Sequence, residues 1–345
     1  MSIDVSVLMP TFRPNPDHFK CALESVLGQT GLNALEIVVV DDSPDDSVEA
    51  VIRSLGSDKI VYFRGRRQGI SDALNLGYRE CRYSYVARMD ADDLCAQDRL
   101  RNQVEFMRRN SIQICGSNAI YKGAAWGAQR FPPGDSDIKF ALAFGCPISH
   151  PSVVVDRMAL GDDMSYDDGL TVCEDYALWT KLAMKGHRFA NVQRPLLRYR
   201  VHDAQATQLR KDVTLQTADR FRRSYWKYYF QDTALSAFVD DERFQTLEFS
   251  DHRDLLEFIG LFFYEAARRH VEGSAAFRVL YPTLMKQSFI GGSLFIETIA
   301  LMRRNDLRAL SFDCIMAGIR ASLGLHSDSA QIRALKRLLK YRNSN

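Results

Sequence analysis

The sequence predicts an α/β fold in which a mixed, mainly parallel sheet carries helices on both faces and is followed by a mainly helical C-terminal region. In the first hundred residues, short apolar segments rich in β-branched residues alternate with segments of helical periodicity. Strands that are apolar throughout are typical of a parallel sheet that is buried on both faces. From about residue 210 onwards, the strand signals disappear and helical periodicity predominates.

The first hundred residues are expected to form strands and helices in the order βαβαβαβ. The strands are predicted at residues 5–9, 37–40, 60–63 and 85–89, and the helices between them at about residues 17–27, 47–55 and 70–81. In the first helix, Phe19, Leu23 and Val26 fall on one face, which is the pattern of a helix packed against a core. Ser47 is a favourable N-cap for the second helix.

The middle of the chain is expected to add two helices and two short strands. Leu100, Val104 and Met107 mark one helix. The other begins near Glu174 and ends at Gly186, a residue that suits a left-handed helix end. The short strands are predicted at residues 112–115 and 152–155, with a Gly/Pro-rich loop region at 123–147 between them. We therefore predict two domains, residues 1–209 and residues 210–345.

Length and composition restrict the class of protein. A chain of 345 residues that is 46% hydrophobic can bury a full core and hold more than one domain. A net charge of +2 gives no argument for nucleic-acid binding. The seven cysteines are scattered without a CxxC pair, which argues for a reducing compartment and against a zinc site or a disulfide framework. No signal-peptide pattern and no charge-free span of about 18 apolar residues is visible, which predicts a cytoplasmic protein or one lying on a membrane surface.

Three carboxylates, Asp90, Asp92 and Asp93, follow the strand predicted at residues 85–89. In an open α/β sheet, ligands bind at this carboxyl end of the strands. The mutual repulsion of the carboxylates costs free energy unless a hard cation or strong donors gather there. Mg²⁺ and Mn²⁺ suit such oxygen ligands and are usually shared with substrate phosphates. From the residues alone, a metal site and a solvated acidic turn before a helix capped by Asp98 both stay open.

Two further polar loops follow strands at the same predicted edge. The first contains Pro10, Thr11 and Phe12, and the second contains Asp42 beside Asp41. A hydroxyl, backbone donors, an aromatic ring and a carboxylate that can accept a base imide N–H are the parts needed to hold a pyrimidine nucleotide. Each loop alone fits ordinary βα-loop composition, because Asp and Ser are good N-caps. Three such loops converging on one edge favour a nucleotide site.

Seven motifs in a fixed order resemble the family-2 glycosyltransferases of the GT-A fold, a Rossmann-like architecture. They read VSVLMPTFRP, EIVVVDDS, RQGISDALNLG, YVARMDADD, HPSV, CEDYALW and RYRVH, and together they span about residues 3–205. The sequence is especially similar to the bacterial branch that builds surface polysaccharides such as O-antigen. The resemblance implies a metal-dependent, inverting transfer of a sugar from a nucleotide-sugar donor, expected to be UDP-linked, to a glycan or polyprenyl-linked acceptor. The first domain would bind the donor and carry out catalysis.

The resemblance also implies roles for individual residues. Those expected to contact the donor nucleotide are Pro10, Thr11, Phe12, Asp42, Gly69, Asn75 and Asp90. Those expected to hold Mn²⁺ or Mg²⁺ are Asp92, Asp90, Asp93 and His202, with Asp92 as the direct ligand within the DxD motif. Leu74 stands where family members often carry Arg. The missing contact with the diphosphate is expected to come from Arg66, Arg67 or Arg88.

The second chemical centre is expected at the start of the helix that follows Cys173. By resemblance, Asp175 is the general base that takes the proton of the acceptor hydroxyl, and Glu174 supports it. From the residues alone, acids at a helix start also simply complement the helix dipole. His202 would contact the metal or the diphosphate by resemblance, although a lone His after a strand is more often structural or exposed. His150 is considered for contact with the acceptor.

Two other functions are open at this level. A sugar nucleotidyltransferase shares a similar sheet but would need a Gly-rich phosphate loop where Pro10 to Pro14 stand. A non-catalytic nucleotide-sugar or glycan-binding module would tolerate the loss of either carboxylate centre, yet both are present.

The end of the chain predicts a basic amphipathic helix. Its apolar face comprises Ile332, Leu335, Leu338 and Leu339, and its basic residues are Arg333, Lys336, Arg337, Lys340 and Arg342. Such a helix can dock on the inner face of an anionic plasma membrane or pack on the core of its own domain. Residues 210–345 are accordingly considered for association with a membrane or a partner protein.

Overall fold

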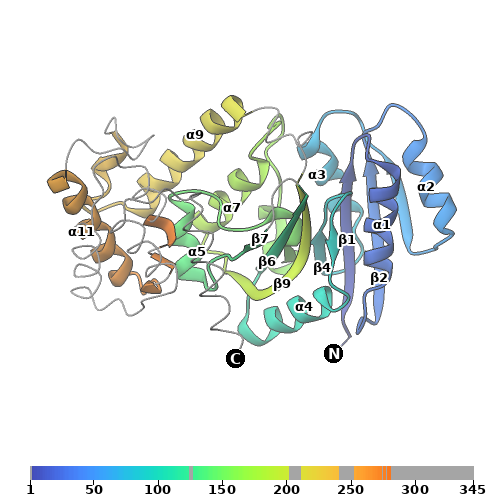
Figure 1. Cartoon of the computed structure of the whole chain (residues 1–345), viewed down its shortest axis with the longest axis horizontal. Coiled ribbons are helices and arrows are strands. Elements are labelled where there is room, and N and C mark those ends of the chain that lie inside the picture. The colour runs from blue at the N-terminus through green and yellow to red at the C-terminus, as the bar shows by residue number, and fades with distance from the viewer. Residues whose placement is uncertain are drawn as a thin grey trace, which may run out of the picture. The chain divides into compact units, whose positions relative to one another are not determined.

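The computed structural model describes residues 2–123, 127–201, 211–240, 252–273, 275–276 and 278–280. The chain divides into two compact units, Met1–Tyr228 and Tyr229–Asn345. Within the described part of the first unit, nine strands form a single mixed sheet with helices packed against it (Figure 1). The predicted assignment of catalysis to residues 1–209 stays a prediction, because these units are defined by packing alone.

The predicted βαβαβαβ order is confirmed. It consists of β1 (Asp4–Thr11), α1 (Pro16–Leu27), β2 (Ala34–Asp41), α2 (Ser47–Leu55), β3 (Ile60–Arg64), α3 (Ile70–Glu80) and β4 (Tyr85–Arg88). The next elements are β5 (Leu94–Cys95), α4 (Arg99–Asn110), β6 (Ile114–Gly123), β7 (Gly127–Gln129), α5 (Asp135–Leu142), η1 (His150–Ser152) and β8 (Val154–Asp156). Then come α6 (Arg157–Leu160), η2 (Gly161–Asp163), α7 (Glu174–Met184), β9 (Phe189–Val201), α9 (Lys211–Tyr229), η3 (Ala237–Asp240) and α11 (His252–Arg268).

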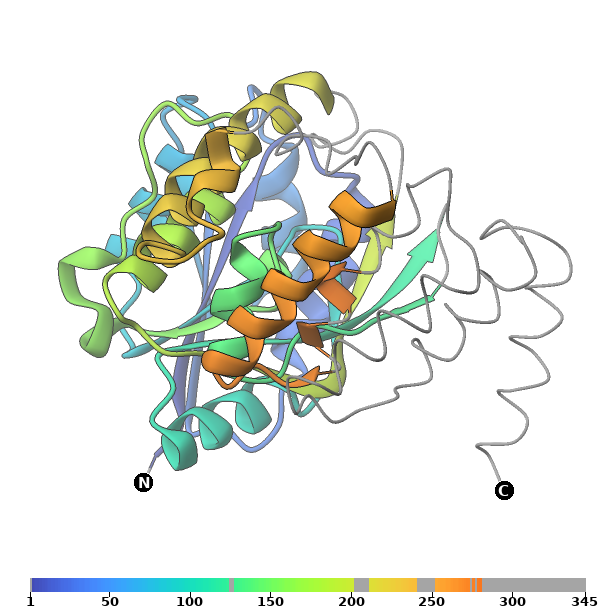
Figure 2. The same cartoon turned by 90° about the vertical axis from the view of Figure 1, so that its left-hand side faces the viewer.

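The sheet combines a parallel half and a mixed half. Its strand order is β3-β2-β1-β4-β8-β6-β9-β5, with β7 paired to β6. The first four strands are parallel, β8 is antiparallel to both of its neighbours, and β6 and β9 run parallel to each other. Figure 2 shows β6 and β9 side by side. The sheet is therefore mixed and mainly parallel at its N-terminal half, as predicted.

Strand β9 is predicted only at its end, before His202, although it is the longest in the described part of the sheet. It contains Pro195, which cannot donate to the strand ladder and which weakens the sequence signal for a strand. The register between β6 and β9 shifts at Asn118, the residue opposite Pro195, so that the irregularity falls where the proline stands. The short strand predicted at residues 112–115 is the beginning of the longer β6.

Alternate residues of the parallel strands face two different helical layers. Val7 of β1 belongs to one core cluster with Phe19 of α1 and Val104 of α4. Leu8 faces the opposite layer, where a Cβ at Gly77 of α3 would collide with the Leu8 side chain. Strands buried on both faces explain the continuous apolar runs that the sequence shows.

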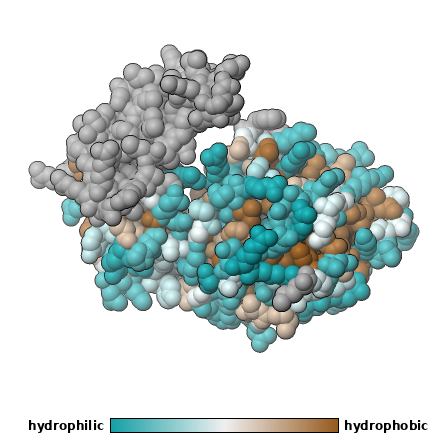
Figure 3. Space-filling model, turned by 90° about the horizontal axis from the view of Figure 1, so that it is seen from below, coloured by the Kyte–Doolittle hydropathy of each residue, from teal (hydrophilic) through white to brown (hydrophobic). Residues whose placement is uncertain are grey.

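Helix α4 is amphipathic in the predicted way. Leu100, Val104 and Met107 are buried, whereas charged residues such as Arg109 face solvent. Seen from below, the surface over α4 is dominated by hydrophilic side chains (Figure 3). The apolar stripe therefore fixes the position of α4 on the sheet.

Helix α9 runs beside α7 in the same direction. Near their starts, the Cys173 thiol approaches the carbonyl oxygen of Thr214 at 3.5 Å, and near their ends Tyr228 donates to the carbonyl of Met184 at 3.0 Å. Tyr225 and Trp226 are fully buried in the first unit. These two aromatic residues of α9 therefore belong to the core of the first unit.

The described part of the second unit is helical, as predicted for the C-terminal region. Phe258 and Phe262 of α11 are buried one turn apart. The guanidinium of Arg269 lies 4.3 Å from the ring centroid of Tyr229, within reach of a cation–π interaction. Across the residues that the structure describes, no helix is long and apolar enough to cross a membrane.

Candidate active site

The three polar loops predicted to converge lie at the same edge of the sheet. Thr11 at the end of β1 is in register with Asp41 at the end of β2, and Leu8 of β1 is in register with Arg88 at the end of β4. The loops that follow these parallel strands therefore leave the sheet side by side. This edge is where an open α/β sheet binds its ligands.

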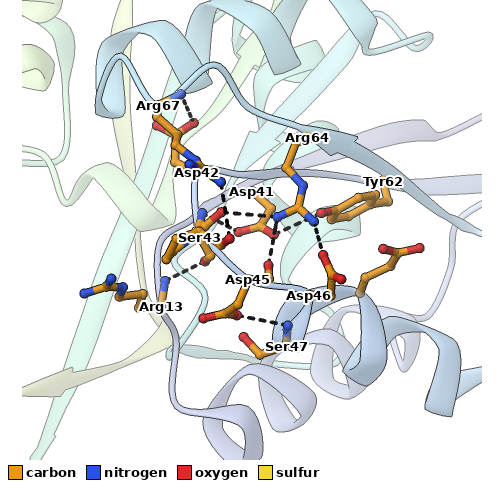
Figure 4. A network of polar contacts seen from close by, with 12 residues as sticks. Arg13, Asp41, Asp42, Ser43, Asp45, Asp46, Ser47, Tyr62, Arg64 and Arg67 are labelled. Atoms are coloured by element: carbon orange, nitrogen blue, oxygen red, sulfur yellow. Dashed lines mark hydrogen bonds and ion pairs between the residues drawn. The ribbon is translucent and has the colours of Figure 1, made fainter.

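Asp41 organises the loop after β2 (Figure 4). Its buried carboxylate accepts hydrogen bonds from the Tyr62 hydroxyl at 3.0 Å and from the backbone N–H of Ser43 at 2.8 Å. Burial and the bond to Asp41 raise the pKa of Tyr62 to about 12, so this phenol keeps its proton. Arg64 pairs with the same carboxylate at 3.5 Å. These contacts fix the conformation of the loop after β2.

Arg64 is a second organiser of this loop that sequence reasoning missed. It donates to the carbonyl oxygens of Ser43 at 3.2 Å and Asp45 at 2.8 Å and pairs with the Asp46 carboxylate at 2.5 Å. The signal was available, because Arg64 ends a strand at the edge where three acidic residues of the neighbouring loop gather. Its contacts hold the loop that presents Asp42.

Asp42 is almost fully buried and leaves little room around its carboxylate. Its Oδ1 accepts a hydrogen bond from the backbone N–H of Arg67 at 3.0 Å. A Cβ at Gly65 would collide with the same Oδ1 atom, so glycine is required for this close approach. The Asp42 carboxylate is thus held in one orientation by the chain after β3.

The loop after β1 contributes a ring and a hydroxyl. Phe12 is 63% exposed, and the Arg13 guanidinium lies 5.4 Å from its ring centroid. The backbone N–H of Arg13 donates to the Ser43 hydroxyl at 2.7 Å, which joins this loop to the one after β2. Thr11 Oγ1 is buried and has no hydrogen-bond partner among the described residues. An exposed ring beside these polar groups offers a stacking surface for a nucleobase.

The acidic cluster consists of Asp90, Asp92 and Asp93, whose ligand atoms lie within 4.8 Å of one another. Asp93 Oδ1 accepts the backbone N–H of Arg200 at 2.8 Å, whereas its Oδ2 is buried without a hydrogen-bond partner in the described part of the chain. Burial and the charge of Asp90 raise the pKa of Asp93 well above its usual range. Three oxygen donors with an orphaned buried atom fit a hard divalent cation, which would supply the missing partner.

Arg88 lies beneath this cluster as a buried cation. Its Nη2 pairs with Asp90 Oδ1 at 2.6 Å, whereas Nε and Nη1 have no partner among the described residues. Burial acts to lower the pKa of Arg88, but the Asp90 carboxylate outweighs it, so the pKa is raised and the charge is kept. Of the arginines expected near the diphosphate, Arg66 pairs with Asp72 and Arg67 donates to a loop carbonyl, so only Arg88 touches the acidic cluster.

Two residues predicted to contact the donor, Gly69 and Asn75, lie just before α3 and within it. Gly69 precedes the helix at a φ of 98°, a conformation that favours glycine. The Asn75 side chain donates to the carbonyl oxygen of Tyr166 and to Asp168 Oδ1, both at 3.0 Å, and accepts the N–H of Tyr166 at 2.9 Å. Asn75 therefore holds the loop that leads to α7, and its direct contact with the donor stays a prediction.

The second carboxylate centre lies at the start of α7, as predicted. Glu174 and Asp175 occupy the first turn after Cys173, whose φ of 60° sharply redirects the chain. Burial and the charge of Glu174 raise the pKa of Asp175, and burial raises the pKa of Glu174. The charges of Arg88 and Asp90 both act on Glu174, so the two carboxylate centres share one electrostatic environment.

His150 lies behind this centre rather than at its surface. Only 6% of the residue is exposed, and its Nε2 lies 2.8 Å from the Tyr166 hydroxyl. Its Nδ1 lies 3.6 Å from Glu174 Oε1. A ring so buried has little surface to offer an acceptor, which was the contact considered from the sequence. His202 lies outside the described residues, and its predicted metal contact stays a prediction.

Comparisons with known proteins identify sequences similar to this chain. The family model described as glycosyl transferase family 2 matches residues 6–177, a segment that runs from β1 to the first turn of α7. Amylovoran biosynthesis glycosyltransferase AmsE of Erwinia amylovora is 31% identical over 202 residues, which cover 56% of this chain and 75% of that protein. UDP-Glc:alpha-D-GlcNAc-diphosphoundecaprenol beta-1,3-glucosyltransferase WfaP of Escherichia coli is 28% identical over 203 residues, covering 57% and 77%.

The fold also resembles that of a solved structure, S. aureus TarS 1–349 in complex with UDP-GlcNAc. The TM-score is 0.55, and the match covers 94% of this chain and 93% of that chain. At 15% sequence identity, the likeness concerns the fold. The predicted GT-A architecture is thereby confirmed.

Proposed function

Because the chain belongs to glycosyl transferase family 2 and is therefore a transferase, we propose that it moves a sugar from a nucleotide-sugar donor to a glycan or polyprenyl-linked acceptor in cell-surface polysaccharide synthesis. The observation that carries the proposal is the acidic cluster of Asp90, Asp92 and Asp93, whose ligand atoms lie within 4.8 Å of one another after a parallel strand of the sheet. The names of AmsE and WfaP support the polysaccharide context and, for WfaP, a UDP-sugar donor and a diphosphoundecaprenol-linked acceptor.

The donor is proposed to be UDP-linked and to lie on the loops after β1 and β2. Phe12 offers its exposed ring to the base, and the fixed Asp42 carboxylate accepts the imide N–H of uracil. The Thr11 hydroxyl, at the end of β1 and without a partner among the described residues, adjoins Phe12. Pro10, Gly69 and Asn75 complete the proposed donor site at the same edge of the sheet.

A divalent cation, Mn²⁺ or Mg²⁺, is proposed to be held by Asp92, Asp90 and Asp93, with His202 as a further candidate. When bound, such an ion neutralises negative charge that develops on the diphosphate leaving group. Arg88 holds Asp90 in the cluster through its ion pair, and the backbone of Arg200 holds one oxygen of Asp93. These contacts fix two of the three carboxylates before any ligand arrives.

Asp175 is proposed as the general base of a single displacement. It takes the proton of the acceptor hydroxyl while that oxygen forms a bond to the anomeric carbon and the bond to the nucleoside diphosphate breaks. Attack opposite the leaving group inverts the anomeric configuration. The raised pKa of Asp175 makes it a better proton acceptor than an ordinary carboxylate. Glu174 is proposed to support it through its neighbouring charge.

The test of the proposed function is a donor screen. Release of nucleotide from a panel of nucleotide sugars is measured with Mn²⁺, with and without lipid-linked acceptors. We expect UDP-sugars to be turned over and an acceptor to accelerate the release. Formation of a nucleotide sugar from a sugar phosphate would instead favour a nucleotidyltransferase, and binding without turnover would favour a binding module; the glycosyltransferase names of the relatives argue against both.

The substitution Gly65→Ala is expected to weaken donor binding. The new Cβ collides with Asp42 Oδ1, so the carboxylate must turn away from the uracil edge. A hydrogen bond to a charged group contributes about 1.5–3 kcal/mol, so we expect the donor KM to rise roughly 10-fold to 100-fold with little change in kcat.

Gly127→Ala is the matched control for that prediction, because a Cβ there meets no atom within 4 Å. It should leave the donor KM unchanged. A Gly65→Ala variant that loses kcat but keeps its donor KM would separate Asp42 from donor recognition.

The pH dependence of kcat/KM is expected to report the charge of Glu174. Since Asp175 must be deprotonated to accept a proton, activity falls as the pH drops through its raised pKa. Glu174→Gln removes a charge that raises this pKa, so the acidic limb should move to lower pH. The matched control is Glu80→Gln, an exposed position at the end of α3. If the acidic limb stays in place in Glu174→Gln, a group other than Asp175 produces that limb.

The C-terminal segment at residues 331–342 lies outside the described residues, and its membrane docking stays a prediction. Truncation before Gln331 should release the protein from anionic vesicles and leave hydrolysis of the donor intact. Electrostatic attraction is screened over about 8 Å at physiological salt, so binding should weaken as ionic strength rises. Co-sedimentation with anionic and neutral vesicles measures this. Equal binding to both kinds of vesicle would contradict an electrostatic role for the basic residues.

A further inference from the structure

A line of polar contacts runs behind the proposed base, and its middle members, Tyr166 and His150, have no part in the reaction described above. Asn75 of α3 bonds to both backbone polar groups of Tyr166. The Tyr166 hydroxyl lies 2.8 Å from His150 Nε2, and His150 Nδ1 lies 3.6 Å from Glu174 Oε1. The contacts therefore connect four segments that are far apart along the chain. They run from Asn75 through Tyr166 and His150 to Glu174, the residue next to Asp175.

The His150 ring is held in place on its other sides as well. Trp179 of α7 meets it edge to face, with ring centroids 5.8 Å apart. Burial and the positive charge of Arg88 lower the pKa of His150 to about 3, so the ring is neutral at any ordinary working pH. A neutral imidazole has one N–H donor and one acceptor nitrogen.

The two contacts of His150 select one tautomer. If Nε2 carried the proton, the lone pair of Nδ1 would face the Glu174 carboxylate, and two acceptors would oppose each other. If Nδ1 carries the proton, Tyr166 donates its O–H to Nε2 and the Nδ1–H points at Glu174. Only the second arrangement satisfies both contacts of His150 while Glu174 is ionised.

We propose that His150, as its Nδ1–H tautomer held by Tyr166, is a positioning residue that orients the Glu174 carboxylate beside Asp175. The inference rests on the proposed function, in which Asp175 is the base. An N–H directed at Glu174 favours its ionised form and restricts the orientation of its carboxylate. Burial opposes the ionisation of Glu174 most strongly and raises its pKa; its own backbone N–H and Arg88 favour ionisation, and Asp90 opposes it. At 3.6 Å the contact is longer than a hydrogen bond, so His150 acts on Glu174 through the electrostatic attraction of its N–H dipole.

The kinetic test compares replacements that keep different nitrogens. The side-chain amide nitrogen of Asn falls near the place of Nδ1, and that of Gln falls near the place of Nε2. We expect His150→Leu and His150→Gln to lower kcat roughly 10-fold to 100-fold, as for other groups that orient a reacting side chain, with the donor KM unchanged. His150→Asn should recover much of this loss, and Tyr166→Phe should show a smaller fall in kcat.

Thermal unfolding of each variant shows whether it folds. A His150→Asn variant that is folded and no better than His150→Gln would overturn the proposal. So would a change confined to the donor KM.

A spectroscopic test needs no sugar transfer and so stands apart from the proposed function. Long-range ¹H–¹⁵N correlation on the full chain labelled at histidine distinguishes a protonated ring nitrogen from an unprotonated one. The His150 signals are assigned by their loss in His150→Asn. We expect Nδ1 protonated and Nε2 unprotonated, with a changed Nε2 shift in Tyr166→Phe. An Nε2–H tautomer would overturn the proposal even if the enzyme transfers sugar, whereas the expected tautomer without any turnover would place the failure in the proposed function.

Discussion

Asp92→Asn is expected to reduce sugar transfer by at least about 10²-fold while the protein stays folded. Removing one of three clustered carboxylates weakens the proposed cation site, so charge on the leaving diphosphate is left uncompensated. Charge stabilisation by a bound metal contributes several kcal/mol, and about 1.4 kcal/mol corresponds to a tenfold change in rate. Nucleotide release measured across a Mn²⁺ titration should show a loss that added metal only partly restores.

Folding should be unaffected, because the substitution relieves repulsion among carboxylates whose ligand atoms lie within 4.8 Å. The thermal midpoint of Asp92→Asn should therefore stay close to that of the wild type. Asp58→Asn is the control. Asp58 is exposed in the turn before β3, whereas the candidate site lies beyond the other end of that strand. Treatment of the wild type with EDTA should reproduce the defect. Full activity of the wild type in metal-free buffer would contradict metal dependence.

The elements that sequence reasoning predicted are those whose signal is local. The apolar runs of β1 and β2 are buried on both faces, and such runs carry their own strand signal. Because parallel strands end at one edge, the convergence of the loops after them followed from the order of elements alone. The register of Thr11 with Asp41 confirms that step.

Strand β9 could not be predicted in the same way. Its central Gln193, Arg194 and Pro195 interrupt the apolar pattern, and the strand is completed by a register shift opposite β6. Such an irregularity depends on the partner strand, which lies about 75 residues earlier in the chain. The sequence around Pro195 therefore reads as a loop until its partner is known.

The residues of the candidate site likewise fall into those with a local sequence signal and those placed by tertiary packing. Asp92 and Asp175 could be named because each follows a strand or starts a helix in a motif. The contact between Tyr166 and His150 could not, because neither residue has a local pattern and both are placed by tertiary packing. Arg88 carried a signal that a closer reading could use: an arginine inside a buried strand needs an acidic partner, and Asp90 is nearby.

Asp175→Asn is expected to lower turnover by about 10²–10⁴-fold while donor affinity survives. The amide nearly preserves the shape of the carboxylate but cannot take the proton of the acceptor hydroxyl. Because Asp175 lies at the start of α7 and the proposed donor residues lie on other loops, binding of the UDP-sugar should be unchanged. Calorimetric titration with a UDP-sugar and single-turnover transfer to acceptor measure the two quantities separately.

The control for this substitution is Asp162→Asn, which removes an exposed carboxylate from the first unit without touching α7. It should retain both donor affinity and turnover. In Asp175→Asn, the fall in transfer should exceed the fall in donor hydrolysis, since water is present in excess and the acceptor hydroxyl depends on the base. A variant that keeps near-normal transfer would leave Asp175 as a charge that complements the α7 dipole and place the base elsewhere. Because Glu174 is the adjacent carboxylate, the double variant with Glu174→Gln would then decide whether it had taken over the proton.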